Sequence, residues 1–137
     1  MEESLKTPRG IRNNNPLNLR RSSNEWLGKI REGSDKEFEQ FVSIEYGIRA
    51  AFVNIRTIMR RNRGCTLRRL IEIWAPAFEN NTCAYVNRVC SRTKLPQSHT
   101  LNFKDKKTMC LVAQAMAEVE NGRLLDIKNF ERAYDMV

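Results

Sequence analysis

The sequence has little of what metal, phosphate and activated-serine chemistry requires. It contains one histidine, His99, and its four cysteines lie too far apart in the chain for a Cys-x-x-Cys pair. A zinc site is therefore not expected, and a cysteine protease that uses His99 is the remaining alternative for these residues. No glycine-rich phosphate loop and no Gly-x-Ser-x-Gly segment occurs among the six glycines. We expect no metal, no cofactor and free, partly buried thiols at Cys65, Cys83, Cys90 and Cys110.

Long apolar runs are also absent. No stretch approaches the roughly 20 apolar residues of a membrane helix, and the polar segment Met1 to Arg9 does not resemble a signal peptide. We therefore expect a protein that is made in the cytoplasm and has no membrane span. The 137 residues, 41% of them hydrophobic, fit one domain. We expect a disordered tail over residues 1–9 and a single domain over residues 10–137.

Positive charge is in excess, with a formal net charge of +8. From Arg49 to Arg69 there are seven arginines and no acidic residue. This excess indicates attraction to a polyanion, such as nucleic acid, an anionic cell-wall polymer or an acidic partner. The alternative is a solvated helix face. Nucleic acid has less support, because the arginines fall on more than one expected helix and few aromatic residues interleave them.

The spacing of apolar residues predicts a mainly α fold (α+β). The clearest helix follows Ser43 and runs to about Asn62, with apolar residues recurring at i, i+4, i+7 and i+8. Short apolar clusters between Asn18 and Val42 predict a small, irregular β-hairpin. Further helices are expected from Thr66 to Pro76, from Thr82 to before Pro96, from Asp105 or Thr108 to Asn121-Gly122, and from Asp126 onward.

Two segments have the composition of a binding site. The first, residues 12–20, contains Asn13-Asn14-Asn15-Pro16, which predicts a rigid turn with outward-facing amides. The second, residues 74–86, reads Trp-Ala-Pro and then Glu-Asn-Asn-Thr before a Tyr-Val pair. Amides together with aromatic side chains suit a sugar ligand. The alternative is that each segment is only a strong turn.

Taken in order, several motifs resemble a family of phage and prophage proteins. They are the asparagine turn, the segment Glu37 to Phe41, Gly47-Ile48-Arg49-Ala50 and the Trp-Ala-Pro…Glu-Asn-Asn-Thr…Tyr-Val block. That family comprises small lysozyme-like structural or lytic proteins associated with virions, and the resemblance covers nearly all of Gly10 to Gly122. It implies other phage proteins as possible partners, and the absence of a signal suggests release by lysis or carriage in a virion. The sequence departs at Leu17, where the family usually has glycine, and a side chain there bears on how closely the backbone approaches a ligand.

A second, looser similarity is to bacterial glucosaminidases of lysozyme-like fold. In those enzymes a helix that ends with the catalytic Glu precedes an asparagine turn, and a later Tyr lines the sugar site. No such helix precedes Asn13, but the segment Leu111 to Gly122 looks like it, which suggests a circular permutation. Glu120 continues the apolar stripe of that helix. A carboxyl group on an inward face has a raised pKa, as a general acid requires.

The resemblance therefore implies a muralytic protein of the lytic transglycosylase or glycoside hydrolase class, which cleaves the β-1,4 glycan of peptidoglycan. Lytic transglycosylases of this fold work with a single Glu, here Glu120 as general acid/base, with Glu118 as the second choice. Glu25, Glu37 and Glu39 flank the expected hairpin and are candidates for a second carboxylate. The candidate substrate-binding residues are Asn14, Asn15, Asn18, Trp74, Asn81 and Tyr85.

Two other functions remain open at the level of the sequence. One is a non-catalytic module of the same fold that binds glycan or another virion protein. The other is a protein that binds nucleic acid or another polyanion. For Glu118 and Glu120 themselves, the alternative to catalysis is an ordinary solvated place on the helix, since charged residues are mostly exposed.

Overall fold

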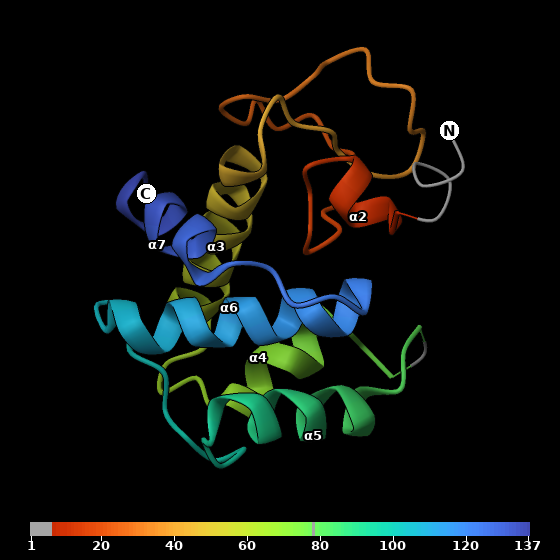
Figure 1. The fold of residues 1–137 in the computed structure, drawn as a ribbon. Coiled ribbons are helices and arrows are strands. Elements are labelled where there is room, and N and C mark those ends of the chain that lie inside the picture. The colour runs from red at the N-terminus through yellow and green to blue at the C-terminus, as the bar shows by residue number, and fades with distance from the viewer. Residues whose placement is uncertain (1–6, 78) are drawn as a thin grey trace.

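The computed structural model describes residues 7–77 and 79–137, and its regular elements there are helices (Figure 1). Residues 1–6 of the expected tail lie outside the described residues, and Arg9 begins the first helix. The expected mainly α fold is thus confirmed. The helices are α2 (Arg9–Arg12), α3 (Ile44–Arg61), α4 (Leu67–Trp74), α5 (Thr82–Thr93), α6 (Lys106–Asn121) and α7 (Ile127–Asp135).

Helix α3 matches the prediction from apolar spacing. It buries Ile48, Phe52 and Ile55 on one face, at i, i+4 and i+7. Ser43 occupies the N-cap position, but its side chain makes no capping hydrogen bond. The helix is therefore fixed by burial of its apolar stripe more than by its cap.

Four later helices begin at side-chain caps. Thr66, Asn81, Asp105 and Asp126 each accept a hydrogen bond from a backbone N–H in the first turn that follows. Such caps contribute about 1 kcal/mol each. The helix expected from Thr82 has Asn81 as its cap, one residue earlier, whereas the sequence favours Thr82 itself for that place. The Thr82 hydroxyl donates instead to the carbonyl of Ala75, which ties α5 to the end of α4.

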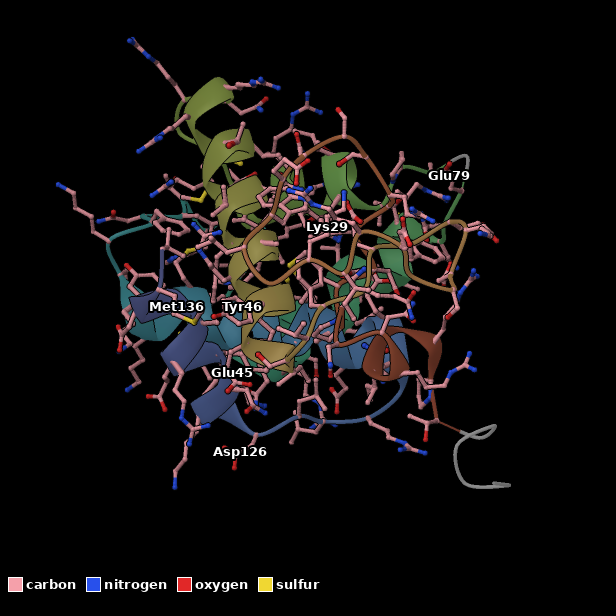
Figure 2. The ribbon with its side chains drawn as sticks, turned by 90° about the horizontal axis from the view of Figure 1, so that it is seen from above. Lys29, Glu45, Tyr46, Glu79, Asp126 and Met136 are labelled. Carbon is pink, nitrogen blue, oxygen red and sulfur yellow. The ribbon has the colours of Figure 1, made fainter. Side chains whose placement is uncertain are left out.

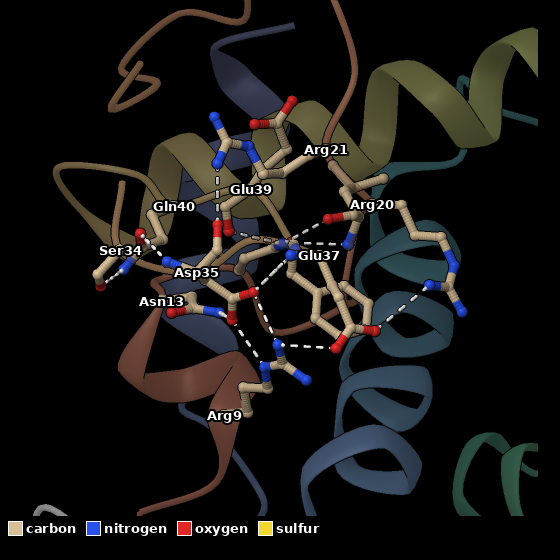
Figure 3. A network of polar contacts seen from close by, with 12 residues as sticks. Arg9, Asn13, Arg20, Arg21, Ser34, Asp35, Glu37, Glu39 and Gln40 are labelled. Carbon is tan, nitrogen blue, oxygen red and sulfur yellow. Dashed lines mark hydrogen bonds and ion pairs between the residues drawn. The ribbon is translucent and has the colours of Figure 1, made fainter. Parts of the chain in front are cut away.

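The expected β-hairpin between Asn18 and Val42 is not confirmed. In this part of the described chain only two isolated antiparallel bridges form, Arg20 with Phe38 and Lys29 with Phe41. Side-chain hydrogen bonds hold the segment where a ladder would otherwise do so. Figure 3 shows the centre of this network at Asp35, whose carboxylate accepts from Arg9 at 2.6 and 2.7 Å and from Asn13 at 2.9 Å. These charge-assisted bonds hold the pKa of Asp35 well below its usual range.

Helix α6 lies at the centre of the molecule, between α5 on one side and α2 and α7 on the other (Figure 1). It buries Met109, Val112 and Met116, as the apolar spacing predicts. Helix α7 packs against both α6 and α3 and buries Phe130 there. The last turn of α6, which carries Glu120, therefore lies next to α2 and the asparagine turn. Among the described residues, no helix combines the length and apolar character needed to cross a membrane.

Candidate functional site

Glu120 is held by two neutral donors from distant parts of the chain. The side-chain amide of Asn18 donates to Oε1 at 3.0 Å, and the hydroxyl of Tyr85 donates to Oε2 at 3.0 Å. Burial raises the pKa of Glu120, while the bonds from Asn18 and Tyr85 act in the opposite direction. The structure thus brings together three of the residues that the sequence proposes for the site.

Each partner of Glu120 has a fixed position. Tyr85 lies in the first turn of α5 and is 5% exposed. Burial, together with the charge of Glu120, raises the pKa of Tyr85 well above its ordinary value, so its hydroxyl stays protonated and remains a donor. Asn18 has a φ of 54°, in the left-handed region that asparagine tolerates. That conformation places its amide beside Glu120.

The prediction that the amides of the asparagine turn face outward is wrong. Asn13 and Asn15 are buried. Asn15 donates to the carbonyls of Leu19 and Glu39 at 2.9 and 3.0 Å and accepts from the Leu19 N–H at 3.0 Å. Asn14 donates to the carbonyl of Phe41 at 3.0 Å. The expectation of outward amides fails because these groups replace the missing strand ladder, and substrate binding by Asn14 and Asn15 stays an untested prediction.

The turn also fits tightly against α3. A side chain at Gly47 would collide with the backbone carbonyl of Asn14. Gly47 is the fourth residue of α3 and has no positive φ, so the position requires glycine for space rather than for its dihedral freedom. This contact positions the turn, and with it Asn18, relative to the body of helices.

Glu118, the second choice for catalysis, is already committed to an ion pair. Its carboxylate accepts two hydrogen bonds from the guanidinium of Arg92, at 2.6 and 2.8 Å, and it is buried. Bidentate pairs of this kind fix geometry. Glu118 therefore links α6 to α5. The carboxyl group of Glu120, in contrast, forms no ion pair among the described residues.

The three carboxylates suggested as partners for Glu120 lie in other surroundings. Glu25 pairs with Arg31 at the surface, and Glu37 pairs with Arg9 and Arg20. Glu39 is buried and pairs with Lys29 at 3.1 Å.

The cleft at Glu120 has a volume of about 160 Å³. Trp74 borders it, as the sequence proposes. The sequence did not identify Arg20, Phe38 and Glu79 as site residues, although Glu79 belongs to the Trp-Ala-Pro…Glu-Asn-Asn block. Figure 2 shows Glu79 at the periphery, on the segment that joins α4 to α5. The cleft is lined by Leu17, Asn18, Arg20, Phe38, Trp74, Ala75, Glu79, Asn80 and Glu120.

Asn81 lies outside this cleft. Its side chain caps α5 by accepting from the Ala84 N–H at 3.1 Å. It also borders a different cavity, of about 400 Å³, together with Tyr85 and Arg88. A role for Asn81 in substrate binding would therefore require a ligand that extends around α5.

Leu17, where the resembling family usually has glycine, directs its side chain into the core and is 1% exposed. Its neighbour Asn121 donates to the carbonyl of Pro16 at 2.7 Å. This hydrogen bond anchors the turn to the last residue of α6. The side chain of Leu17 packs into the core and also forms part of the wall of the cleft.

The thiols offer no second site in the described part of the chain. Cys65 and Cys110 are buried, Cys83 is exposed, and none of the four is in a disulfide. Burial raises the pKa of Cys110 to about 11, which disfavours the thiolate. No group of His, Cys, Asp and Glu side chains among the described residues could hold a metal ion.

The fold and the cleft define a class: a small, basic, mainly helical domain that holds a desolvated carboxyl group between a tyrosine and an asparagine. No family model matches the chain. The chain is similar to "Protein P5" of Pseudoalteromonas phage PM2, with 37% identity over 117 residues; the match covers 83% of this chain and 71% of the relative. It belongs to the family of this phage protein, and the expected relation to phage proteins is confirmed.

Proposed function

We propose that the protein is muralytic and cleaves the β-1,4 glycan of peptidoglycan by a single-Glu acid/base mechanism at Glu120. The observation that carries the proposal is the environment of this carboxyl group. Glu120 is half-buried, has no cationic partner among the described residues, and accepts from two neutral donors at 3.0 Å. Burial without a cation keeps a carboxyl group protonated to higher pH, as a general acid requires.

The reaction needs one group that first gives and then takes a proton. Glu120 donates its proton to the glycosidic oxygen as the bond between that oxygen and the sugar C1 breaks. The resulting carboxylate accepts the proton of the same sugar's C6 hydroxyl, whose oxygen bonds to C1. The products are a shortened glycan and a 1,6-anhydro sugar, and Glu120 is protonated again.

The donors to Glu120 serve both halves of this cycle. The hydroxyl of Tyr85 and the amide of Asn18 stabilise the carboxylate that forms after the first proton transfer. Neither donor carries a formal charge, so the carboxyl group can still be protonated at the start. Trp74, which borders the cleft, provides an apolar face on which a sugar ring can stack.

We also propose a lysozyme-like fold with a permuted order of elements. Helix α6 carries Glu120 in its last turn, and the asparagine turn lies beside that end although it comes first in the chain. Two contacts support this arrangement: Asn121 donates to the carbonyl of Pro16, and Asn18 donates to Glu120. The helix that precedes Asn13 is α2, which has only four residues and no acid.

The test is mass spectrometry of the soluble products after incubation with peptidoglycan. We expect the wild-type protein to release anhydro-muropeptides and Glu120→Gln to lower the rate by at least about a hundredfold, since positioned acid–base catalysis contributes this much. The control is Glu45→Gln, which removes one negative charge from the first turn of α3, away from the cleft residues. Thermal unfolding of each variant separates loss of activity from loss of fold.

Unchanged digestion by Glu120→Gln would contradict the assignment. Release of muropeptides without an anhydro ring would show that the protein hydrolyses the glycan and is not a transglycosylase. Glu79, which borders the same cleft, would then be the candidate for the second carboxylate.

A second function is a non-catalytic virion module of the same fold that binds glycan or another phage protein. The size of the cleft supports it, because about 160 Å³ is below the roughly 300–1,000 Å³ of typical ligand sites. Retained binding to peptidoglycan with no soluble product from the wild-type protein would favour this function.

A further inference from the structure

We propose that a second cavity, which shares four lining residues with the cleft at Glu120, binds a carboxylate of the stem peptides of peptidoglycan through Arg61. The proposal deepens the proposed function and rests on it. It adds Arg61 to the site as a binding residue and predicts the direction in which a substrate strand lies.

The second cavity has a volume of about 390 Å³. It shares Leu17, Asn18, Arg20 and Trp74 with the smaller cleft. A ligand longer than one sugar would therefore pass from Glu120 across Trp74 into this cavity. Together the two cavities reach the volume that a ligand of several rings needs.

One face of α3 forms the wall of the second cavity. Asn54, Thr57, Ile58 and Arg61 all line it, at the i, i+3, i+4 and i+7 spacing of a single helix face. Asn54 presents its amide there without a hydrogen-bond partner among the described residues. The wall thus combines an amide, a hydroxyl and a guanidinium around an apolar floor that includes Ile73 and Trp74.

Arg61 is the charged residue of this wall that has no acidic partner among the described residues. It is the last residue of α3 and is exposed, and its side chain makes no ion pair or hydrogen bond within the described part of the chain. Arg20, the other arginine at the cavity, is already near acids, with Glu37 and Glu79 each at 3.9 Å. An unpaired guanidinium at the edge of a cavity can receive a carboxylate in a bidentate geometry.

The two cavities differ in their charged groups. Glu79, Glu120 and Arg20 line the small cleft, where Arg20 lies near Glu79, whereas Arg61 lines only the larger cavity. A neutral glycan such as chitin gains nothing from this asymmetry. Peptidoglycan carries carboxylates on its stem peptides, and Arg61 is the arginine of the two cavities that has no acidic partner among the described residues. The strand therefore lies with a stem peptide toward Arg61.

The experiment measures binding by calorimetry with three soluble probes of similar glycan length. They are peptide-bearing glycan strands, the same strands after an amidase has removed each peptide and left a lactyl carboxylate on the sugar itself, and a chitooligosaccharide without any carboxylate. Binding is measured in the Glu120→Gln protein, so that the strands are not cut, with and without Arg61→Gln. The matched control is Arg63→Gln, which removes the same charge from an exposed residue that lines neither cavity.

We expect Arg61→Gln to weaken binding of peptide-bearing strands about tenfold, the effect of one charge-assisted contact near the surface. Binding of the chitooligosaccharide and of the stripped strands should be unchanged, and Arg63→Gln should have little effect on any probe. An equal loss in Arg61→Gln and Arg63→Gln would overturn the subsite in favour of general charge attraction. An equal loss on stripped strands would overturn the stem peptide as the source of the carboxylate.

Digestion by the wild-type protein separates this proposal from the proposed function. If the wild-type protein releases anhydro-muropeptides and Arg61→Gln binds every probe as well as its parent, the subsite fails and the proposed function stands. If the wild-type protein neither digests peptidoglycan nor binds any of the probes, the proposed function fails and the subsite fails with it.

Discussion

At the scale of single residues, Glu120 is a carboxyl group under two opposing influences. Burial favours its protonated form, and the donors Asn18 and Tyr85 favour its charged form. Because burial is the larger effect, the pKa of Glu120 is raised, and each donor that is removed should raise it further. The pH dependence of activity therefore reports on these two hydrogen bonds.

Tyr85→Phe tests this balance. If Glu120 acts as a general acid, activity falls as the pH rises through its pKa. Loss of the Tyr85 hydroxyl removes a bond that lowers this pKa, so the fall should move to higher pH. The maximal rate should drop about tenfold, because the carboxylate formed in the reaction loses one donor. The measurement is the pH profile of anhydro-muropeptide release.

The control for Tyr85→Phe is Tyr134→Phe. Tyr134 also donates its hydroxyl, to the carbonyl of Phe103 at 2.6 Å, but it lies on α7 and does not line the cleft. This variant should lower stability without moving the pH profile. An identical profile for Tyr85→Phe and the wild-type protein would show that Tyr85 does not act on the catalytic proton.

The asparagines show how far a residue's type predicts its role. Three asparagines before a proline correctly indicate a turn, since asparagine tolerates left-handed backbone, as Asn14 does here at φ 53°. Side-chain direction does not follow from the same rule. Asn15 turns inward because backbone groups of Leu19 and Glu39 need partners, and those groups come close only in the folded chain.

At the scale of elements, the helices from α3 to α7 were predictable, whereas α2 and the segment between α2 and α3 were not. Each long helix has an apolar stripe at helical spacing and a polar residue or glycine at its ends, and these signals are local in the sequence. Residues 18–42 lack strict alternation, and their order depends on Asp35, which joins this segment to Arg9 and Asn13 of the N-terminal region. No local pattern encodes such a contact.

Gly47→Ala tests the contact between the asparagine turn and α3. In an exposed helix interior this change would stabilise by about 0.5–1 kcal/mol. Here the new methyl group would collide with the carbonyl of Asn14, so we expect the free energy of unfolding to fall by about 2–3 kcal/mol, as in overpacked cores. Chemical denaturation measures the difference.

Gly64→Ala is the matched comparison for Gly47→Ala. Gly64 has open space around it and a φ of 66°, so its loss should cost only about 1 kcal/mol, from left-handed backbone strain. Equal stability of Gly47→Ala and the wild-type protein would show that the turn can move away from α3 at little cost.

At the scale of the whole molecule, the site forms from parts that are distant in sequence. Glu120 and Tyr85 were identified through the resemblance to lysozyme-like proteins, and the structure brings them within hydrogen-bond distance. Arg20, Glu79 and Arg61 were not identified, because a cavity is a property of how α3, α4 and α6 pack and no single segment carries it. The seven-arginine segment was visible as charge, but only Arg61 of this segment lines the second cavity.

The net charge of +8 leads to a prediction for the whole protein. Attraction to an anionic cell wall should be screened by salt, since the Debye length falls from about 14 Å at 0.05 M to about 4 Å at 0.5 M. We expect binding to whole peptidoglycan, measured by co-sedimentation, to weaken over this range, while binding of a neutral chitooligosaccharide stays constant. The chitooligosaccharide contacts only the cleft, where short-range contacts with residues such as Trp74 do not depend on salt.

The same measurement with double-stranded DNA tests the alternative that the protein binds nucleic acid. A protein that binds nucleic acid through its arginines would lose DNA binding steeply as salt rises, because each phosphate contact releases a counterion. In this protein Arg68 and Arg69 pair with Glu72, and Arg56 lies over the ring of Phe103, so these arginines are partly occupied. We therefore expect DNA binding to be weaker than wall binding at every salt concentration. Tighter binding to DNA than to peptidoglycan at about 0.15 M salt, where the Debye length is about 8 Å, would instead make the arginine segment a nucleic-acid site and remove charge attraction as support for a wall substrate.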